Sequence, residues 1–311
     1  VLVIALAQIL PIGCGESLAS TPISNTPSSQ SLLTIIIPQV DNNTITPLPD
    51  LIPIADPTLA PVAASQSELP NVHSQSWDEV RGVAADIDGN LYVVGFTLGN
   101  LIGHINLGKA DAFISKRNSA GEEIWSDQFG SQDQDLAYDV SIDKNGDIYV
   151  VGGTTGTLPG QIADGPGDSF VRKYAPQGIV SWTRQFGSDR HDEARAVATD
   201  MYGNVYIVGM TGSPLLGEKH LGREDGYLQK YDSLGTPIWT QQFGTDKNDR
   251  ASAVALDHSG NIYVAGGTQR TINGQTSAGR LDAFLIKYDN TGTELWIRQF
   301  GSSEVDWAYA V

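Results

Sequence analysis

A set of residues recurs through this chain at a constant interval of 57 residues, and this recurrence limits the fold more than any other feature. Tyrosine, Phe-Gly and aspartate positions follow the interval, and no residue is inserted or lost between copies. The recurring tryptophans are Trp125, Trp182, Trp239 and Trp296. A fixed period of this length indicates a tandem repeat protein, in which each copy forms one supersecondary unit.

Each copy contains four short stretches that are typical of β-strands. In the first copy we expect strands at residues 80–86, 90–97, 111–117 and 123–129, joined by turns that contain Gly89 and Gly121. Four antiparallel strands at such a period predict an all-β fold, a β-propeller whose blades are four-stranded sheets. The repeated tryptophans would then fill the space between blades. A β-solenoid is the alternative, but its rungs are usually shorter.

The repeat unit also resembles a known family. The sequences DAFISK at residues 111–116, DSFVRK at 168–173 and DAFLIK at 282–287 each lead to a glycine, a tryptophan and Phe-Gly. A pattern D-x-x-G-N-x-Y-V-x-G-x-T follows, as at residues 257–268, and the third copy departs slightly with Asp225-Gly226-Tyr227. These units resemble the SBBP family, the "seven-bladed β-propeller" repeat of bacterial secreted and surface proteins. The resemblance covers residues 77–311 and implies a propeller.

Residues 307–311 align with the opening strand of a fifth copy. We therefore expect four copies plus the start of a fifth in residues 77–311, and a parent protein with further copies. The sequence is interpreted as a fragment.

The segment before the repeats has a different composition. Residues 1–14 are mostly apolar and end at Cys14, the only cysteine, which is typical of the h-region of a signal peptide. Residues 10–14 also resemble a bacterial lipobox, with Pro11 where leucine is usual, so we expect lipidation of Cys14. Simple signal cleavage and a structural thiol are the alternatives. Residues 15–76 are rich in Pro, Ser and Thr and predict a disordered linker.

Charge limits the classes of partner. The chain has a net charge of −17, and residues 1–76 contain five acidic residues and no Lys or Arg. An acidic surface repels phosphate backbones and anionic headgroups, which argues against nucleic acid and leaves a lipid anchor as the membrane contact. A protein or a carbohydrate is the expected partner. The expected location is extracytoplasmic: a lipoprotein of the outer membrane or cell surface, or a secreted protein.

Aspartates in the first hairpin turn of each copy suggest a calcium hypothesis. Alternating oxygen-bearing side chains around a glycine are the ligands that Ca²⁺ prefers. The candidates are Asp86, Asp88, Asn90, Asp143, Asn145 and Asp147. The alternative, which we favour, is that these carboxylates cap turns by accepting backbone N–H groups. Met201-Tyr202 and His258-Ser259 interrupt the alternation in later copies.

The variable loops at residues 98–110, 155–167, 212–224 and 269–281 are the expected ligand face. The candidate contacts there are His104, Lys219, Arg223 and Arg280. No catalytic set is recognisable, so we expect no enzyme and no cofactor other than calcium. The sequence favours a non-catalytic binding or scaffolding propeller. A quinoprotein-like enzyme is one alternative, because Asp232-x-x-Gly235-x-x-x-Trp239 resembles a tryptophan-docking repeat; a polysaccharide-cleaving propeller is another.

Overall fold

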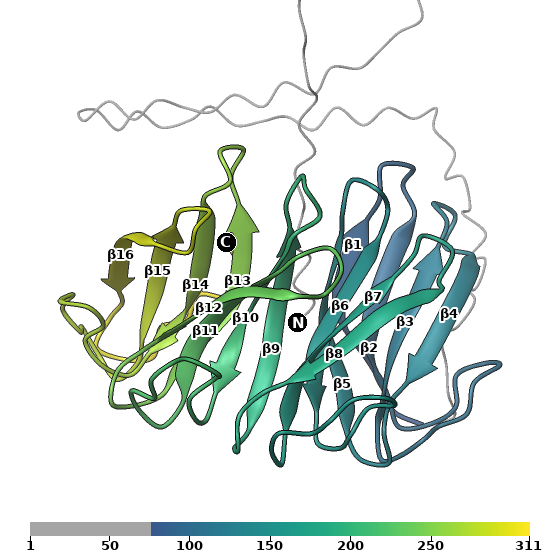
Figure 1. Ribbon diagram of the computed structural model, residues 1–311, viewed down its shortest axis with the longest axis horizontal. Helices are drawn as coiled ribbons and strands as arrows, with labels where there is room; N and C mark the ends of the chain where they lie inside the picture. The colour runs from purple at the N-terminus through teal and green to yellow at the C-terminus, as the bar shows by residue number, and fades with distance from the viewer. Residues whose placement is uncertain (1–75) are drawn as a thin grey trace, which may run out of the picture. The chain divides into compact units, whose positions relative to one another are not determined.

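The computed structural model of the protein describes residues 76–311, which form sixteen β-strands in four antiparallel sheets of four (Figure 1). The strands are β1 Asp78–Ala85, β2 Leu91–Thr97, β3 Asp111–Arg117, β4 Glu123–Phe129, β5 Asp135–Ile142, β6 Ile148–Thr154, β7 Asp168–Tyr174, β8 Val180–Phe186, β9 Asp192–Thr199, β10 Val205–Thr211, β11 Asp225–Tyr231, β12 Pro237–Phe243, β13 Asp249–Leu256, β14 Ile262–Thr268, β15 Asp282–Tyr288 and β16 Glu294–Phe300. The expectations for residues 1–75, including lipidation of Cys14, lie outside this part of the chain.

Each sheet is one 57-residue copy, with its strands paired in chain order. The turns explain this local folding: Gly89 and Gly121 have φ values of 80° and 84°, which glycine adopts without steric cost. The third and fourth predicted strands match β3 and β4 residue for residue. The first begins two residues earlier than predicted, at Asp78. The propeller prediction is confirmed. The solenoid alternative is wrong, because the four strands of each copy pair with one another in a separate sheet.

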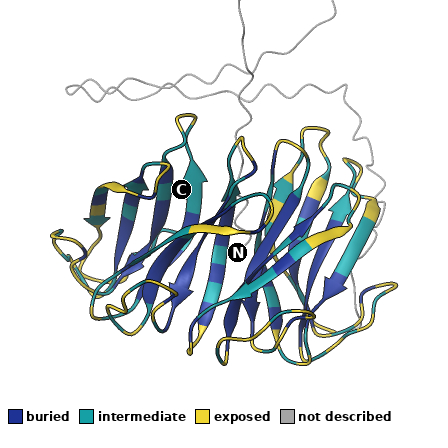
Figure 2. Cartoon of the chain, viewed as in Figure 1, coloured by how far each residue is buried: buried dark blue, intermediate teal, exposed yellow. Residues whose placement is uncertain are grey.

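The blades stand side by side in sequence order, and their first strands form the inner edge. β1, β5, β9 and β13 each contact the next in this series. The fourth strands, β4, β8, β12 and β16, form the outer edge. Figure 2 shows that the buried residues lie mainly on the middle strands, where one blade faces another. The first strands therefore line an axis, as in other propellers.

Aromatic side chains fill the seams between blades. The Phe129 ring meets the Phe170 ring of the next blade edge to face, with centroids 5.6 Å apart, and Phe243 meets Phe284 in the same way at 5.6 Å. Each tryptophan packs against the tyrosine of its own blade's second strand, as Trp182 does against Tyr149. The indole Nε1–H of Trp182 also donates to the carbonyl oxygen of Ser233 in the next blade, at 3.2 Å.

The variable loops are fastened to the following blade. Ala110 forms a parallel bridge with Gln134, and the Asp135 N–H donates to the Ala110 carbonyl oxygen at 2.8 Å. Leu101 is buried beneath its loop, and its N–H donates to the Gln128 side chain at 2.8 Å. Blades are thus joined through both side-chain packing and backbone hydrogen bonds. Within residues 76–311 no helix is long and apolar enough to span a bilayer.

Candidate functional site: the axial cavity

A β-bulge interrupts the first strand of every blade at the same repeat position. The register of β1 with β2 shifts between Val80 and Gly82, which leaves Arg81 without a partner on β2. Equivalent shifts occur in the other three blades. The bulged residues are Arg81, Tyr138, Arg195 and Ser252. A bulge re-aims the side chain of the extra residue, and here it does so on the strands that line the axis.

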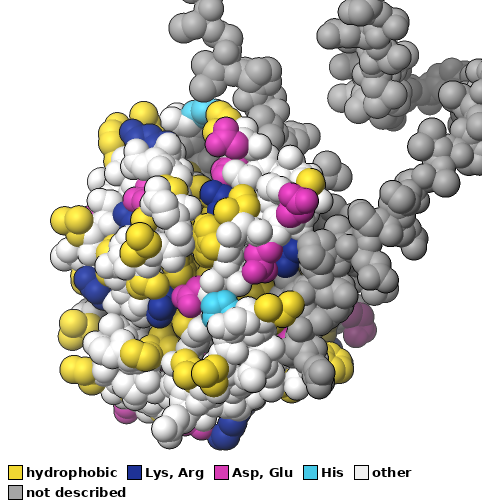
Figure 3. Space-filling view, turned by 90° about the vertical axis from the view of Figure 1, so that its right-hand side faces the viewer, with side chains coloured by type: hydrophobic (Ala, Val, Ile, Leu, Met, Phe, Trp, Pro, Cys, Tyr) yellow, Lys and Arg dark blue, Asp and Glu magenta, His cyan; other side chains and the backbone are white. Residues whose placement is uncertain are grey.

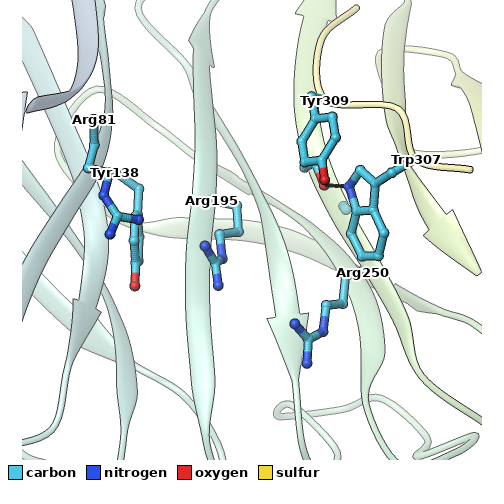
Figure 4. A pocket seen from close by; sticks show the side chains of 8 residues that line it. Arg81, Tyr138, Arg195, Arg250, Trp307 and Tyr309 are labelled. Carbon is cyan, nitrogen blue, oxygen red and sulfur yellow. Dashed lines mark hydrogen bonds between the residues drawn. The ribbon is translucent and has the colours of Figure 1, made fainter. Parts of the chain in front are cut away.

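These side chains meet in one cavity of about 410 Å³, which we call the axial cavity (Figure 4). Its side chains come from the first strands of all four blades and from the C-terminal segment. The lining is Arg81, Tyr138, Arg195, Arg250, Ser252, Trp307 and Tyr309. The volume lies within the range of about 300–1,000 Å³ that is common for small-ligand sites.

Tyr138 lies between two guanidinium groups. The Arg195 guanidinium carbon is 4.5 Å from the centroid of the Tyr138 ring, and that of Arg81 is 5.4 Å from it. Burial, and then the charge of Glu193, raise the pKa of the Tyr138 hydroxyl, and the two arginines offset this only in part. The hydroxyl is therefore neutral at physiological pH and able to donate a hydrogen bond. Cation–π contacts of this kind hold the three side chains in one arrangement.

Each arginine of the axial cavity also has an acidic partner. Arg81 pairs with Glu79 at 2.5 Å, and Arg195 pairs with Glu193. The Arg250 Nε and Nη2 atoms are both 2.6 Å from Glu224 Oε2. A guanidinium has five N–H donors, and such pairs use only one or two of them. The remaining donors are available to a ligand, while the carboxylates cancel most of the local positive charge.

The C-terminal segment supplies two aromatic rings. Trp307 packs on Gly267, where a Cβ atom would come within 2.7 Å of the indole. Its Nε1–H donates to Ser252 Oγ at 2.7 Å, and its ring is stacked on Tyr309 with centroids 6.0 Å apart. Trp307 and Tyr309 are the fifth-copy equivalents of Arg250 and Ser252.

Sequence reasoning did not find this site, although a signal was present. Two positions near the bulge are constant between copies: the aspartate that opens the strand and the valine at Val83, Val140, Val197 and Val254. The bulge position itself changes from Arg to Tyr, Arg and Ser. Variation in charge and shape at one position, two residues before a valine that every copy keeps, indicates that this position does not serve the packing shared by all blades.

The four loop residues proposed from the sequence lie elsewhere and are spread over three blades. His104 is half-buried and within 3.2 Å of Ser126 in its own blade. Lys219, Arg223 and Arg280 are exposed. Arg223 lines a second cavity of about 340 Å³ beside His191, and its backbone N–H donates to Lys247. The structure does not bring these four residues together in one cavity.

The turn carboxylates proposed as calcium ligands are engaged by the protein itself. Asp86 Oδ1 accepts the N–H groups of Asp88 and Asn90 at 3.1 and 2.9 Å. Asp143 does the same for Asn145 and Asp147, at 2.8 and 3.0 Å. Burial opposes ionisation of Asp86, but hydrogen bonds from Asn90 and Tyr92 outweigh it and lower the pKa of the carboxyl. No group of three or more His, Cys, Asp or Glu side chains suited to a metal occurs in residues 76–311.

Charge on the surface is mixed. Figure 3 shows the side of the molecule at the right of Figure 1, where basic and acidic side chains are scattered among hydrophobic ones. That face offers no field of one sign to attract a polyelectrolyte.

Comparison with known proteins finds a matching repeat model and two distant relatives. The SBBP model, described as a beta-propeller repeat, matches residues 74–103, 124–159, 181–215 and 238–270. The regulatory protein FlaEY of Caulobacter vibrioides is 28% identical over 201 residues, which are 58% of this chain and 21% of that protein. An uncharacterised WD repeat-containing protein of Acanthamoeba polyphaga mimivirus is 24% identical over 169 residues, 45% of this chain and 12% of that protein. The chain thus spans about a fifth of the length of the first relative and about an eighth of the second.

Solved structures with similar folds are also distant. A protein of unknown function from Bacteroides caccae has a TM-score of 0.42 and 14% identity, covering 73% of this chain and 71% of that one. The WD40 domain of Neurospora crassa Pan2 has a TM-score of 0.41 and 14% identity, covering 72% and 66%.

Proposed function

We propose, on the premise that this chain is a β-propeller repeat protein of the SBBP family, that it is a non-catalytic binding protein whose ligand occupies the axial cavity. One observation carries the proposal: the bulged position of the first strand differs between copies, as Arg81, Tyr138, Arg195 and Ser252, and these four side chains converge there. Residues that pack between blades recur in every copy because every seam is alike. A single ligand on the axis, in contrast, is contacted by a different part of its surface in each blade. Copy-to-copy variation at the axis is therefore the pattern expected of a binding site.

The relative FlaEY is named a regulatory protein, which supports a binding or regulatory role. We further propose that the propeller acts outside the cytoplasm, held by a lipid on Cys14 or released after signal cleavage. Support comes from the apolar run before Cys14 and the Pro-rich stretch after it. Incorporation of labelled palmitate by the expressed chain, and its loss in Cys14→Ser, would test the anchor.

The binding function is tested by a panel of soluble oligosaccharides, peptides and small carboxylates in a calorimetric screen. A ligand of the axial cavity should bind the wild type, lose most of its affinity in Arg195→Ala and keep it in Lys219→Ala, the loop control. Binding that depends on Lys219 but not on Arg195 would contradict the proposal. Conversion of a bound ligand to product would contradict the non-catalytic part and favour an enzyme.

A further inference from the structure

We propose that the axial cavity binds an uncharged pyranose ring of a glycan, stacked on Trp307 and hydrogen-bonded by the paired arginines of the first strands. The inference rests on the proposed binding function and names the chemical class of its ligand. Three features of the cavity carry it: an aromatic platform, arginines with free donors beside carboxylates, and a local charge close to zero.

The aromatic platform is the first feature. Trp307 and Tyr309 present stacked rings on one side of the cavity, with an interplanar angle of 29°. The Trp307 indole is fixed by its hydrogen bond to Ser252 and by contact with Gly267. A pyranose has a face of C–H groups that packs on such a ring without loss of hydrogen bonds. A fixed platform also limits the entropy lost on binding.

Donors and acceptors are the second feature. Sugar hydroxyls each donate and accept, so they require both kinds of group on the protein. Arg81 with Glu79 on the first blade, and Arg195 with Glu193 on the third, each place a donor beside an acceptor. The Tyr138 ring lies between the two guanidinium groups. The array is opposite the aromatic platform, as Figure 4 shows for Arg81, Tyr138 and Arg195 relative to Trp307.

Local charge is the third feature, and it separates a neutral sugar from an anion. The three arginines of the cavity are matched by Glu79, Glu193 and Glu224. Burial opposes ionisation of Glu193, but its contacts with His191 and Arg195 outweigh this and lower the pKa of the carboxyl. Because each guanidinium group is already paired with a carboxylate, its attraction for a phosphate or carboxylate ligand is reduced. A neutral polyol needs no net positive charge and accepts hydrogen bonds from the guanidinium groups.

The test is titration calorimetry of the full chain. Cellobiose, maltotriose and chitobiose are the neutral probes. Galacturonic acid, an acidic hexapeptide and inorganic phosphate serve as anionic probes. We expect at least one neutral probe to bind, with a dissociation constant that changes less than twofold between 50 and 500 mM NaCl. Screening has little effect on an uncharged ligand, whereas it weakens the binding of an anion.

Variants locate the contacts. Trp307→Ala should weaken neutral binding at least tenfold, and Trp307→Phe should restore part of it because the phenyl ring keeps the platform. Arg81→Gln tests the hydrogen-bonding side without removing the side chain. Lys219→Ala is the control outside the cavity, and unchanged melting curves show that each variant is folded.

Neutral-sugar binding that Trp307→Ala leaves unchanged overturns the inference. Salt-insensitive binding of a neutral sugar that is lost in Trp307→Ala supports the inference. Binding of an anionic probe alone, weakened by salt and by Arg195→Ala, overturns the inference and leaves the proposed binding function standing. Failure of every probe of both kinds, together with failure of the wider panel, overturns both.

Discussion

The indole of Trp125 is stacked on the phenol ring of Tyr174, with centroids 6.0 Å apart and an interplanar angle of 29°, although the two residues belong to successive blades. On its other side Trp125 meets Tyr92 of its own blade edge to face, at 6.3 Å. Gly178, in the next blade's turn, lies so close to the indole that a Cβ atom would come within 2.7 Å of it. One side chain therefore joins two repeats.

Replacement of Trp125 by alanine should lower the free energy of unfolding by about 3 kcal/mol. The substitution leaves a void between two blades, and the surrounding strands cannot move to fill it. The same substitution at Trp296 is the control. The Trp296 ring contacts the Tyr263 ring of its own blade, with centroids 6.2 Å apart. Its replacement by alanine should lower the free energy of unfolding by less than half as much. Urea unfolding followed by circular dichroism measures both values. Equal losses in the two variants would contradict a role of the tryptophan between blades.

Asp139 predicts a pH-dependent change of stability. It stands where other copies have Gly82, Ala196 and Ala253. Burial raises the pKa of its carboxyl to about 6, which the N–H groups of Val197 and Val140 offset only in part. The unfolded value is about 3.9. The folded state thus binds the proton more tightly, and this stabilisation is present at low pH and lost as pH rises toward 6.

The difference in stability between the variant Asp139→Ala and the wild type should therefore change sign with pH. Two pKa units correspond to about 3 kcal/mol, and the lost hydrogen bond from Val197 costs about 1 kcal/mol. We expect the variant to be more stable than wild type by about 1–2 kcal/mol above pH 7 and less stable by about 1 kcal/mol near pH 4. Unfolding at a series of pH values measures the difference. A constant difference from pH 4 to 8 would contradict the raised pKa.

Gly152 on β6 should tolerate no side chain. A Cβ atom there would overlap the Leu136 carbonyl oxygen and come within 2.7 Å of the Phe170 ring. Because backbone on the adjacent strand cannot yield, Gly152→Ala should cost about 3 kcal/mol or prevent folding. Gly160→Ala is the matched control: its φ is +74° and nothing lies within 4 Å, so only conformational strain of about 1 kcal/mol is expected. Similar losses at both glycines would argue against the packing at β6.

Substitutions at Asp86 and Asp88 distinguish the two interpretations of the hairpin-turn carboxylates, as turn caps or as calcium ligands. As turn caps, Asp86→Ala should cost about 1 kcal/mol because its carboxylate accepts the hydrogen bonds, whereas Asp88→Ala should cost nothing because Asp88 contributes its backbone N–H. As calcium ligands, both side chains would matter and the melting temperature would rise with Ca²⁺. Thermal melts of the wild type and both variants, in EDTA and in millimolar Ca²⁺, distinguish them. We expect equal melting in the two buffers.

The sequence alone determined the repeat, the four strands of each copy and the propeller architecture. Those features are local: Gly89 and Gly121 permit turns only at certain points, and β-branched residues such as Val93 and Val94 favour the strand between them. Because the same signals recur every 57 residues, each copy must form the same sheet. Stacking of identical blades then follows from the need to bury the aromatic faces.

Only the tertiary structure decided where the variable side chains meet. A bulge at Arg81, Tyr138 and Arg195 turns these residues toward the axis, and a one-residue change of register cannot be read from an alternating pattern. The loops around His104 and Arg223 were predicted to form the ligand face, whereas in the structure these residues contact Ser126 and Lys247 and lie in different blades. Convergence of residues 57 positions apart depends on how the blades are arranged around the axis, which no single copy specifies.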